Sequence, residues 1–195
     1  MYRESLENSE TEPSMRRLHE VCQRISELPN ISSSVGVLLK RKSEIGELEY
    51  LVVYNADKNS FGNPAGHLNE GETLLEAVER EVQEETNISA QQYQLTGISQ
   101  AMLASGTEKS SLLVVYEGQI MDDVPNEQEI IDEDVTFVRF MTPEEIRKET
   151  VEYERHEGST ILRVETDMHK QSPEDLLENL KRYFDECGID ESVLF

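Results

Sequence analysis

The sequence predicts an α/β or α+β fold in which helices lie on both sides of a mixed β-sheet. Helical and strand-like patterns follow one another along the chain in the order helix, strands, helix, strands, helix, which is typical of these classes. The 195 residues are enough for one domain with a substantial core. Hydrophobic residues make up 36% of the chain and charged residues 30%, which is the composition of a folded protein rather than a disordered one.

The first expected element is a helix that follows a polar tail, and the two together occupy residues 1–30. The helix should run from Ser14 to about Leu28, because its apolar side chains recur at helical spacing. They are Met15, Leu18, Val21, Cys22 and Ile25. Strands are then expected at Ser33–Lys40 and Leu48–Tyr54, and a glycine- and proline-containing loop from Asn55 to Gly71.

A second helix is expected from Thr73 to Thr86, because Thr73 and Glu76 have the spacing of a capping box. Three further strands are expected at Gln94–Leu103, Leu112–Ile120 and Val135–Met141. The sheet should therefore be built from strands that lie before and after this helix in the sequence.

The last part of the chain contains two more helix starts. Thr142 and Pro143 give an N-cap followed by a proline at the first helical position, so a helix should begin there. Residues 31–150 are the expected main domain. Residues 151–195 are expected to form an appendage packed on it, with a helix that opens at Ser172.

The charge of the chain limits its partners. Lys and Arg number 18 against 41 Asp and Glu, a formal net charge of -23. So acidic a surface repels nucleic-acid phosphates and anionic lipid, and neither a large nucleic acid nor a membrane is an expected partner. A small phosphorylated substrate remains compatible, because a divalent ion can reverse the local charge. With no segment resembling a signal peptide or a membrane span, and only Cys22 and Cys187 as cysteines, a cytoplasmic location is expected.

The second helix carries the pattern that points to chemistry. At 100° per residue, Glu81, Glu84 and Glu85 fall within an arc of about 100°. An apolar stripe is expected beside that arc, made of Leu75, Val78 and Val82. Glu76 and Glu79 lie on the far side of the helix and are interpreted as ordinary solvated residues.

Carboxylates at positions i, i+3 and i+4 repel one another by roughly 0.2–0.5 kcal/mol per pair even when exposed. Next to an apolar stripe the repulsion grows, so either protonation or a cation is needed. Mg²⁺, or Mn²⁺ in its place, suits a few carboxylates together with water and substrate phosphates. Arg80 can reach a neighbouring carboxylate such as Glu72 and hold it in place. The three carboxylates alone would also fit a solvated acidic face, which is common in acidic proteins.

The spacing from residue 66 to residue 88 resembles the Nudix box, G-x5-E-x7-R-E-U-x-E-E-x-G-U, where U is a bulky aliphatic residue. Eight positions match: Gly66, Glu72, Arg80, Glu81, Val82, Glu84, Glu85 and Ile88. The resemblance to the Nudix hydrolase superfamily covers about residues 32–150. The one departure is Asn87, where the pattern has glycine. A left-handed conformation is expected there, and asparagine adopts it most easily after glycine.

The resemblance implies a Nudix-like α/β/α sandwich in which the box forms a loop–helix–loop. It implies a Mg²⁺-dependent enzyme that cleaves a phosphoanhydride bond of a small nucleoside or other organic di- or triphosphate, by attack of water at phosphorus. The implied metal ligands are Glu81, Glu84, Glu85 and the carbonyl of Gly66. The implied catalytic residues are Glu84, Glu81, Arg80 and Glu72. In these roles Glu72 orients Arg80, and Glu84 or a loop acid outside the box takes a proton from the water.

Residues Pro64–Ala77 are most similar to small bacterial hydroxymethylpyrimidine and thiamine diphosphate phosphatases, which also act on nucleoside di- and triphosphates. This similarity suggests a substrate group. Several side chains outside the box stay open between a binding role and a structural one: His67, Phe61, Lys40 and Arg139. A catalytic base could also come from the acidic segment Asn126–Asp134, where the candidates are Glu127, Glu129 and Glu133.

Two other functions have different requirements. A Nudix-fold module that binds a phosphorylated ligand without turnover would be expected to have lost a box carboxylate, and none is lost here. An acidic structural protein with no site would require the match in spacing to be accidental. The terminal extensions could support a homodimer or cover the site, and their sequences do not decide between these roles.

Overall fold

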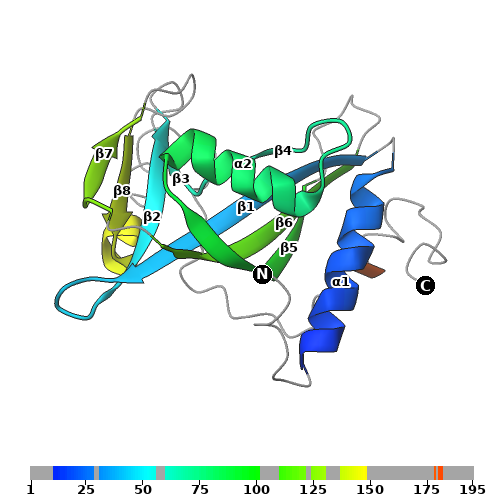
Figure 1. The fold of residues 1–195 in the computed structure, drawn as a ribbon, viewed down its shortest axis with the longest axis horizontal. Helices are drawn as coiled ribbons and strands as arrows, with labels where there is room; N and C mark the ends of the chain where they lie inside the picture. The colour runs from blue at the N-terminus through cyan, green and yellow to red at the C-terminus, as the bar shows by residue number, and fades with distance from the viewer. Residues whose placement is uncertain are drawn as a thin grey trace.

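The computed structural model describes residues 11–28, 31–55, 60–101, 110–121, 124–130 and 137–148, together with residues 178, 180 and 181 (Figure 1). Its elements are α1 (Thr11–Ser26), β1 (Ile31–Lys42), β2 (Leu48–Asn55), β3 (Ser60–Gly62), β4 (Ala65–His67), α2 (Leu74–Thr86), β5 (Ala90–Ala101), β6 (Ser110–Ile120), β7 (Glu127–Glu129) and β8 (Phe137–Met141). The order of helices and strands agrees with the prediction.

The strands form a mixed sheet, as predicted. Its order is β5-β6-β1-β2-β8-β7, and the short strands β3 and β4 pair with β2 and β1. β1 and β6 run parallel, from the pair Ile31–Ser110 to the pair Lys40–Gln119. The other strand pairs are antiparallel. The strands thus form one open mixed sheet, in keeping with the expected α+β fold.

Strand β1 has two different partners along one edge. Its residues 34–36 pair with β4, whereas its residues 40–42 pair with β2. The fork places β4, and therefore Gly66, beside the middle of β1, where α2 contacts both strands. Figure 1 shows α2 crossing in front of β1 beside β4.

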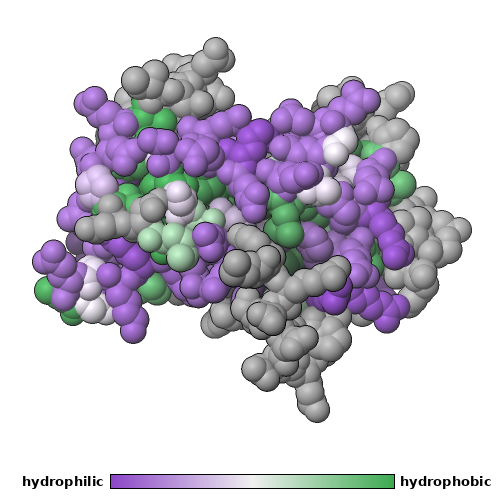
Figure 2. Space-filling view, in the orientation of Figure 1, coloured by the Kyte–Doolittle hydropathy of each residue, from purple (hydrophilic) through white to green (hydrophobic). Residues whose placement is uncertain are grey.

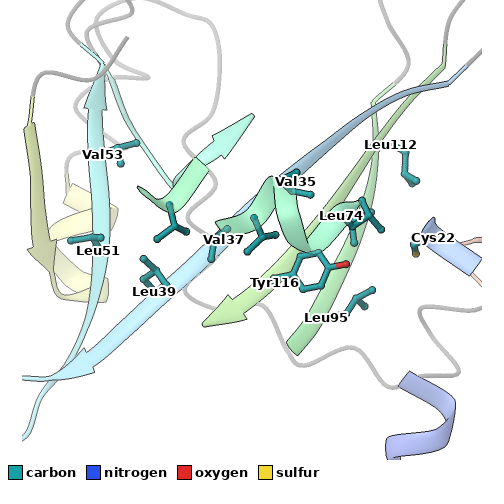
Figure 3. Close-up of a cluster of buried hydrophobic side chains, with 14 of the residues drawn as sticks. Cys22, Val35, Val37, Leu39, Leu51, Val53, Leu74, Leu95, Leu112 and Tyr116 are labelled. Atoms are coloured by element: carbon teal, nitrogen blue, oxygen red, sulfur yellow. The ribbon is translucent and has the colours of Figure 1, made fainter. Parts of the chain in front are cut away.

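The main core lies between the sheet and the helices α1 and α2. It contains apolar side chains from both helices and from five strands, drawn in part in Figure 3. On β1 the burial pattern places Val35, Val37 and Leu39 in this core. The helical spacing predicted for α1 is confirmed, since Leu18, Val21, Cys22 and Ile25 are at most 3% exposed. Viewed from this side, the surface over the core is largely hydrophilic, as the net charge requires (Figure 2).

A smaller cluster on the opposite face of the sheet contains Val52, Met141 and Ile146. Residues 143–148 are helical, as predicted from Thr142 and Pro143. The Thr142 hydroxyl accepts a hydrogen bond from the Glu145 backbone N–H, and the Glu145 carboxylate accepts from the Thr142 N–H. Helices therefore lie on both sides of the sheet, and the predicted layered architecture is confirmed.

Three details differ from the prediction. Helix α1 begins at Thr11 instead of Ser14, with Pro13 in its first turn, where a proline costs no intrahelical hydrogen bond. The predicted loop Asn55–Gly71 contains β3 and β4, which at three residues each are too short to show a periodic pattern. The acidic segment Asn126–Asp134 contains β7, which is likewise too short to show a periodic pattern.

Most of the predicted C-terminal appendage lies outside the described residues, including the helix start at Ser172 and the residue Cys187. Among the described residues of this part, Leu180 is fully buried. It belongs to the same core cluster as the apolar side chains of α1. Among the described residues, no helix has the length and hydropathy needed to span a membrane.

Candidate active site

The loop between β4 and α2 is closed by hydrogen bonds that the local sequence supplies. The Glu72 backbone N–H donates to the Asn69 carbonyl (3.1 Å), and the Asn69 N–H donates to the Glu72 carboxylate (2.8 Å). Helix α2 then begins with the predicted capping box: the Thr73 hydroxyl accepts from the Glu76 N–H, and the Glu76 carboxylate accepts from the Thr73 N–H. Glu76 thus serves the helix start and is exposed, as expected of a solvated residue.

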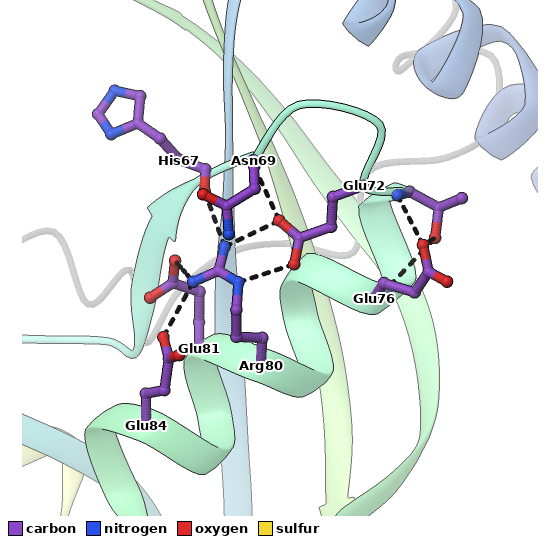
Figure 4. A network of polar contacts seen from close by, with 8 residues as sticks. His67, Asn69, Glu72, Glu76, Arg80, Glu81 and Glu84 are labelled. Atoms are coloured by element: carbon purple, nitrogen blue, oxygen red, sulfur yellow. Dashed lines mark hydrogen bonds and ion pairs between the residues drawn. The ribbon is translucent and has the colours of Figure 1, made fainter.

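Arg80 lies at the centre of a polar network in which all five of its N–H donors are used (Figure 4). Two of them, on Nε and Nη2, donate hydrogen bonds to the Glu72 carboxylate at 2.7 and 2.9 Å. Nη1 donates to Glu81 at 2.7 Å and to Glu84 at 3.0 Å. The remaining donor on Nη2 reaches the His67 carbonyl at 2.9 Å. The expected contact between Arg80 and Glu72 is therefore present in bidentate form.

Burial and charge act differently on the carboxylates of this network. The side-chain hydrogen bond from Arg80 is the main reason that the pKa of Glu72 lies below its ordinary value. The pKa of Glu81 is raised instead, because burial outweighs the hydrogen bond from Arg80 and because Glu84 and Glu72 add negative charge. The same carboxylates raise the pKa of Arg80, which remains fully charged. Burial thus makes the charged form of Glu81 less favourable, although Arg80 donates to its carboxylate.

Glu81 packs against the backbone of β4. A Cβ atom placed on Gly66 would overlap the Glu81 carboxylate, so glycine is needed here for space and not for an unusual φ angle. The neighbouring Ala65 N–H donates to Glu85 at 2.8 Å. Two of the predicted metal-binding glutamates therefore lie against the strand that carries Gly66, and the third, Glu84, is half exposed beside them.

The faces of α2 differ in one respect from the projection of the sequence. Leu75, predicted to belong to the apolar stripe, is 38% exposed, whereas Leu74 and Ala77 are fully buried. Glu81 itself is only 8% exposed and lies on the buried face rather than beside it. The physical reason is Gly66: the missing side chain on β4 leaves room for a carboxylate between the helix and the sheet.

The donor set can be tested for its fit to a divalent cation. Its members are carboxylate oxygens, the ligands that Mg²⁺ prefers, and several carboxylates share one guanidinium. Within the described part of the chain, no three acidic, histidine or cysteine side chains already converge on one point. Glu81 and Glu84 instead both form ion pairs with Nη1 of Arg80. The donor chemistry therefore fits a cation, which would have to share these carboxylates with Arg80.

The end of α2 has the geometry expected for residue 87. Asn87 has φ 51° and ψ 32°, which is the left-handed conformation, and its N–H donates to the Gln83 carbonyl. Its side chain accepts a hydrogen bond from Gln83 at 2.9 Å. Asparagine therefore performs the capping role that glycine has in the box pattern.

Four side chains outside the box were left open between a binding role and a structural one, and the structure gives the contacts of each. The His67 ring points away from Arg80 in Figure 4, so this residue contributes its carbonyl to the network. Phe61 packs against Tyr54 and Phe137, with ring centroids 5.0 and 6.0 Å away. The Arg139 guanidinium lies 4.7 Å from the centre of the Phe61 ring. Lys40 forms an ion pair with Glu117 at 2.6 Å.

The acids proposed as a base outside the box lie at the far edge of the sheet. Glu127 and Glu129 are exposed on β7, which is separated from β1 and β4 by β8 and β2. Glu133 lies outside the described residues. The structure therefore brings Glu72, Arg80, Glu81, Glu84, Glu85 and Gly66 together, and it holds Glu127 and Glu129 on another strand.

The sequence did not reveal the backbone groups of this site. The Ala65 N–H and the His67 carbonyl hold Glu85 and Arg80, but main-chain donors and acceptors are present at almost every residue. Both groups belong to β4, the short strand centred on Gly66. The glycine of the box is therefore the sequence signal that could have located them.

Comparison with known proteins agrees with this geometry. Residues 32–160 match the NUDIX domain, which is well over half of the chain. The chain belongs to the Nudix family. Nudix hydrolases generally use divalent metals, in keeping with the carboxylate-rich helix, and the predicted membership of the Nudix family is confirmed.

Individual relatives extend the comparison. The chain is 36% identical over 105 residues to the phosphatase NudJ of Shigella boydii, an alignment that covers 52% of this chain and 65% of the relative. The fold is similar to a NUDIX hydrolase from Nitrosomonas europaea, with TM-score 0.51, 22% identity, and coverage of 80% and 89% of the two chains. It is also similar to the NUDIX domain of Shewanella oneidensis NrtR in complex with ADP ribose, with TM-score 0.51, 14% identity, and coverage of 79% and 86%.

Proposed function

We propose that this Nudix protein is a Mg²⁺-dependent hydrolase, with Mn²⁺ able to replace Mg²⁺, that cleaves a phosphoanhydride bond of a small nucleoside or other organic di- or triphosphate. The observation that carries the proposal is the network around Arg80. It gathers Glu72, Glu81 and Glu84 on one side of α2, with Glu81 pressed against Gly66. The net charge of the site as it stands is negative, so a phosphate can approach only together with a cation.

The residues of the network have distinct proposed roles. Glu81, Glu84, Glu85 and the Gly66 carbonyl would hold the divalent ion, which when bound neutralises the substrate phosphates and lowers the pKa of the attacking water. Glu84 is the most exposed of the carboxylates that Arg80 contacts, with its side chain 52% exposed, and is proposed to accept the proton of that water. Glu72 holds Arg80, and Arg80 orients Glu81 and Glu84.

The substrate group is proposed from similarity. The relative that shares 36% identity is named a phosphatase, and the chain spans just under two thirds of its length. Residues 64–77 resemble hydroxymethylpyrimidine and thiamine diphosphate phosphatases. We therefore expect a small organic diphosphate of this kind, or a nucleoside di- or triphosphate, among the substrates.

A second candidate is a module that binds a phosphorylated ligand without efficient turnover. One structural neighbour is a NUDIX domain in complex with ADP ribose. In this chain Arg80 already occupies the carboxylates of Glu81 and Glu84, an arrangement that would also suit a domain that binds no catalytic ion. The retention of Glu72, Glu81, Glu84 and Glu85 favours the enzyme.

The deciding experiment is a screen of diphosphates and triphosphates with Mg²⁺, in which released phosphate is measured before and after addition of pyrophosphatase. Release of orthophosphate, or of pyrophosphate that becomes visible only after pyrophosphatase, supports the hydrolase and identifies the bond that breaks. Tight binding of the same compounds without release of either product would establish the binding module instead. A thermal shift with Mg²⁺ alone measures the cation site separately.

The domain boundaries and the assembly are part of the proposal. The hydrolase domain is proposed to span residues 31–150, with extensions at 1–30 and 151–195. A homodimer formed through these extensions would have twice the chain mass of 22.4 kDa, which light scattering in solution measures directly.

A further inference from the structure

Helix α1 precedes the residues that match the NUDIX domain, yet it packs on β1 and contacts the start of α2. The matched region begins at residue 32, and α1 ends at Ser26. Cys22 and Ile25 of α1 are fully buried and share one core with Leu74 of α2. Figure 1 shows α1 beside the N-terminal end of α2. An element outside the family domain is thus part of the support of the helix that carries the carboxylates.

One polar contact joins the two helices. The side-chain carbonyl of Gln23 accepts a hydrogen bond from the Leu74 backbone N–H at 2.8 Å. Leu74 is the first residue of α2, and the first N–H groups of a helix have no acceptor within the helix. Since a backbone N–H can only donate, the Gln23 atom that faces it must be the oxygen. The Gln23 amide nitrogen donates to Glu27 at 3.3 Å, which fixes the same orientation.

This contact lies at the junction between the loop and the helix of the site. Three consecutive residues at the junction are each held by a different partner: Glu72 by Arg80, Thr73 by Glu76 and Leu74 by Gln23. A shift of Leu74 would move Glu72, because only Thr73 separates them. Arg80 would then lose the geometry of its bidentate pair.

We propose that Gln23 is a positioning residue of the active site, whose hydrogen bond to Leu74 fixes the start of α2 and thereby the Glu72–Arg80 pair. The catalytic role of the Glu72–Arg80 pair rests on the proposed function, whereas the contact between the two side chains is observed in the structure. Gln23 acts through Leu74 and touches none of the carboxylates in the network.

Three variants separate this role from a general contribution of α1 to folding. Gln23→Met keeps the size of the side chain and removes the acceptor. The exchange Gln23→Glu with Glu27→Gln keeps an acceptor at residue 23 and a donor at residue 27, and it moves one negative charge to residue 23, where the N-terminus of α2 favours it. Ile25→Val is the matched control, because it loosens the packing of α1 and leaves the hydrogen bond in place.

The first readout is the rate of hydrogen exchange of the Arg80 Nε–H, measured by NMR in the protein without added metal. The second is the Mg²⁺ concentration that gives half of the maximal thermal shift. In Gln23→Met we expect each to rise about 3- to 10-fold, the range produced by loss of one neutral hydrogen bond. The exchanged pair should return both values to within about 2-fold of wild type. Ile25→Val should lower the Tm with both values unchanged.

The inference is overturned if Gln23→Met matches Ile25→Val in Arg80 exchange and in the Mg²⁺ half-point, or if the exchanged pair fails to restore them. Gln23→Ala also lacks the acceptor and replaces Gln23→Met if that variant does not fold. Failure of the proposed function gives a different result. The wild type would then hydrolyse no diphosphate and show no Mg²⁺ shift, while the exchange rates of Arg80 would still distinguish the variants.

Discussion

The Glu81 carboxylate lies so close to the Cα atom of Gly66 that residue 66 has no room for a side chain. Gly66→Ala should therefore displace Glu81 from the sheet. We expect turnover to fall by at least about 10-fold and the free energy of unfolding to fall by about 1–3 kcal/mol, the cost of an overpacked site. Steady-state kinetics and urea unfolding measure the two effects.

Gly36→Ala is the matched control for that substitution. Gly36 lies on β1 opposite Ala65, and a Cβ there would first meet Leu113 at 3.6 Å, an ordinary contact. This variant should keep turnover within about 2-fold. Equal losses in the two variants would contradict a specific role for the space at Gly66.

The two sides of α2 should respond differently to loss of one charge. Glu84 receives a hydrogen bond from Arg80, whereas Glu79 is exposed about 140° away around the helix. At saturating Mg²⁺, Glu84→Gln should lower turnover by at least about 10²-fold, and Glu79→Gln should leave it nearly unchanged. Similar small effects from both substitutions would mean that this face of α2 is not the catalytic one.

Asn87 tests whether the departure from the box pattern matters. Asn87→Gly removes the hydrogen bond from Gln83 but suits the left-handed backbone, so stability should change by well under about 2 kcal/mol and activity by a few-fold at most. Asn87→Ala should be less stable than Asn87→Gly by about 1–2 kcal/mol, because alanine disfavours positive φ. Chemical denaturation compares the three proteins, and a large gain in turnover in the glycine variant would identify the natural protein as a weakened enzyme.

His19 on α1 is expected to make the stability of the protein dependent on pH. Its ring nitrogen Nδ1 and the Tyr116 hydroxyl are 2.8 Å apart, and burial lowers the pKa of His19 below 6.5, with Glu20 acting in the opposite direction. Between the lowered pKa and 6.5 the unfolded chain binds more protons than the folded one, so stability must rise with pH in that window. Urea midpoints should therefore fall as the pH drops below 6.5, and by less in His19→Gln. Equal pH dependence in both proteins would contradict this assignment.

Features fixed by neighbouring residues could be predicted from the sequence. The capping box at Thr73 and Glu76 depends on atoms three residues apart, and it forms as expected. The left-handed Asn87 depends on its place at the helix end. The contact between Arg80 and Glu72, which lie eight residues apart across the start of α2, also forms as expected.

Features that depend on distant backbone could not be predicted. A helical projection gives no sign that β4 lies next to Glu81 or that Gly66 makes room for it, so it places Glu81 beside the buried face and not on it. The strand β4 is visible only through its pairing with β1, since three residues carry no period. The contact of Gln23 with Leu74 joins positions 51 residues apart, with no local pattern that relates them.

The parallel pairing of β1 and β6 also determines when the site can form. Ile31 pairs with Ser110 and Lys40 with Gln119, so the centre of the sheet brings together segments distant in the sequence. Such long-range pairing is slow, whereas α2 can begin to form from its own capping box. During synthesis the carboxylate helix would thus leave the ribosome well before β6 does. We therefore expect a product truncated before β6 to carry the complete box on a sheet that lacks the parallel neighbour of β1.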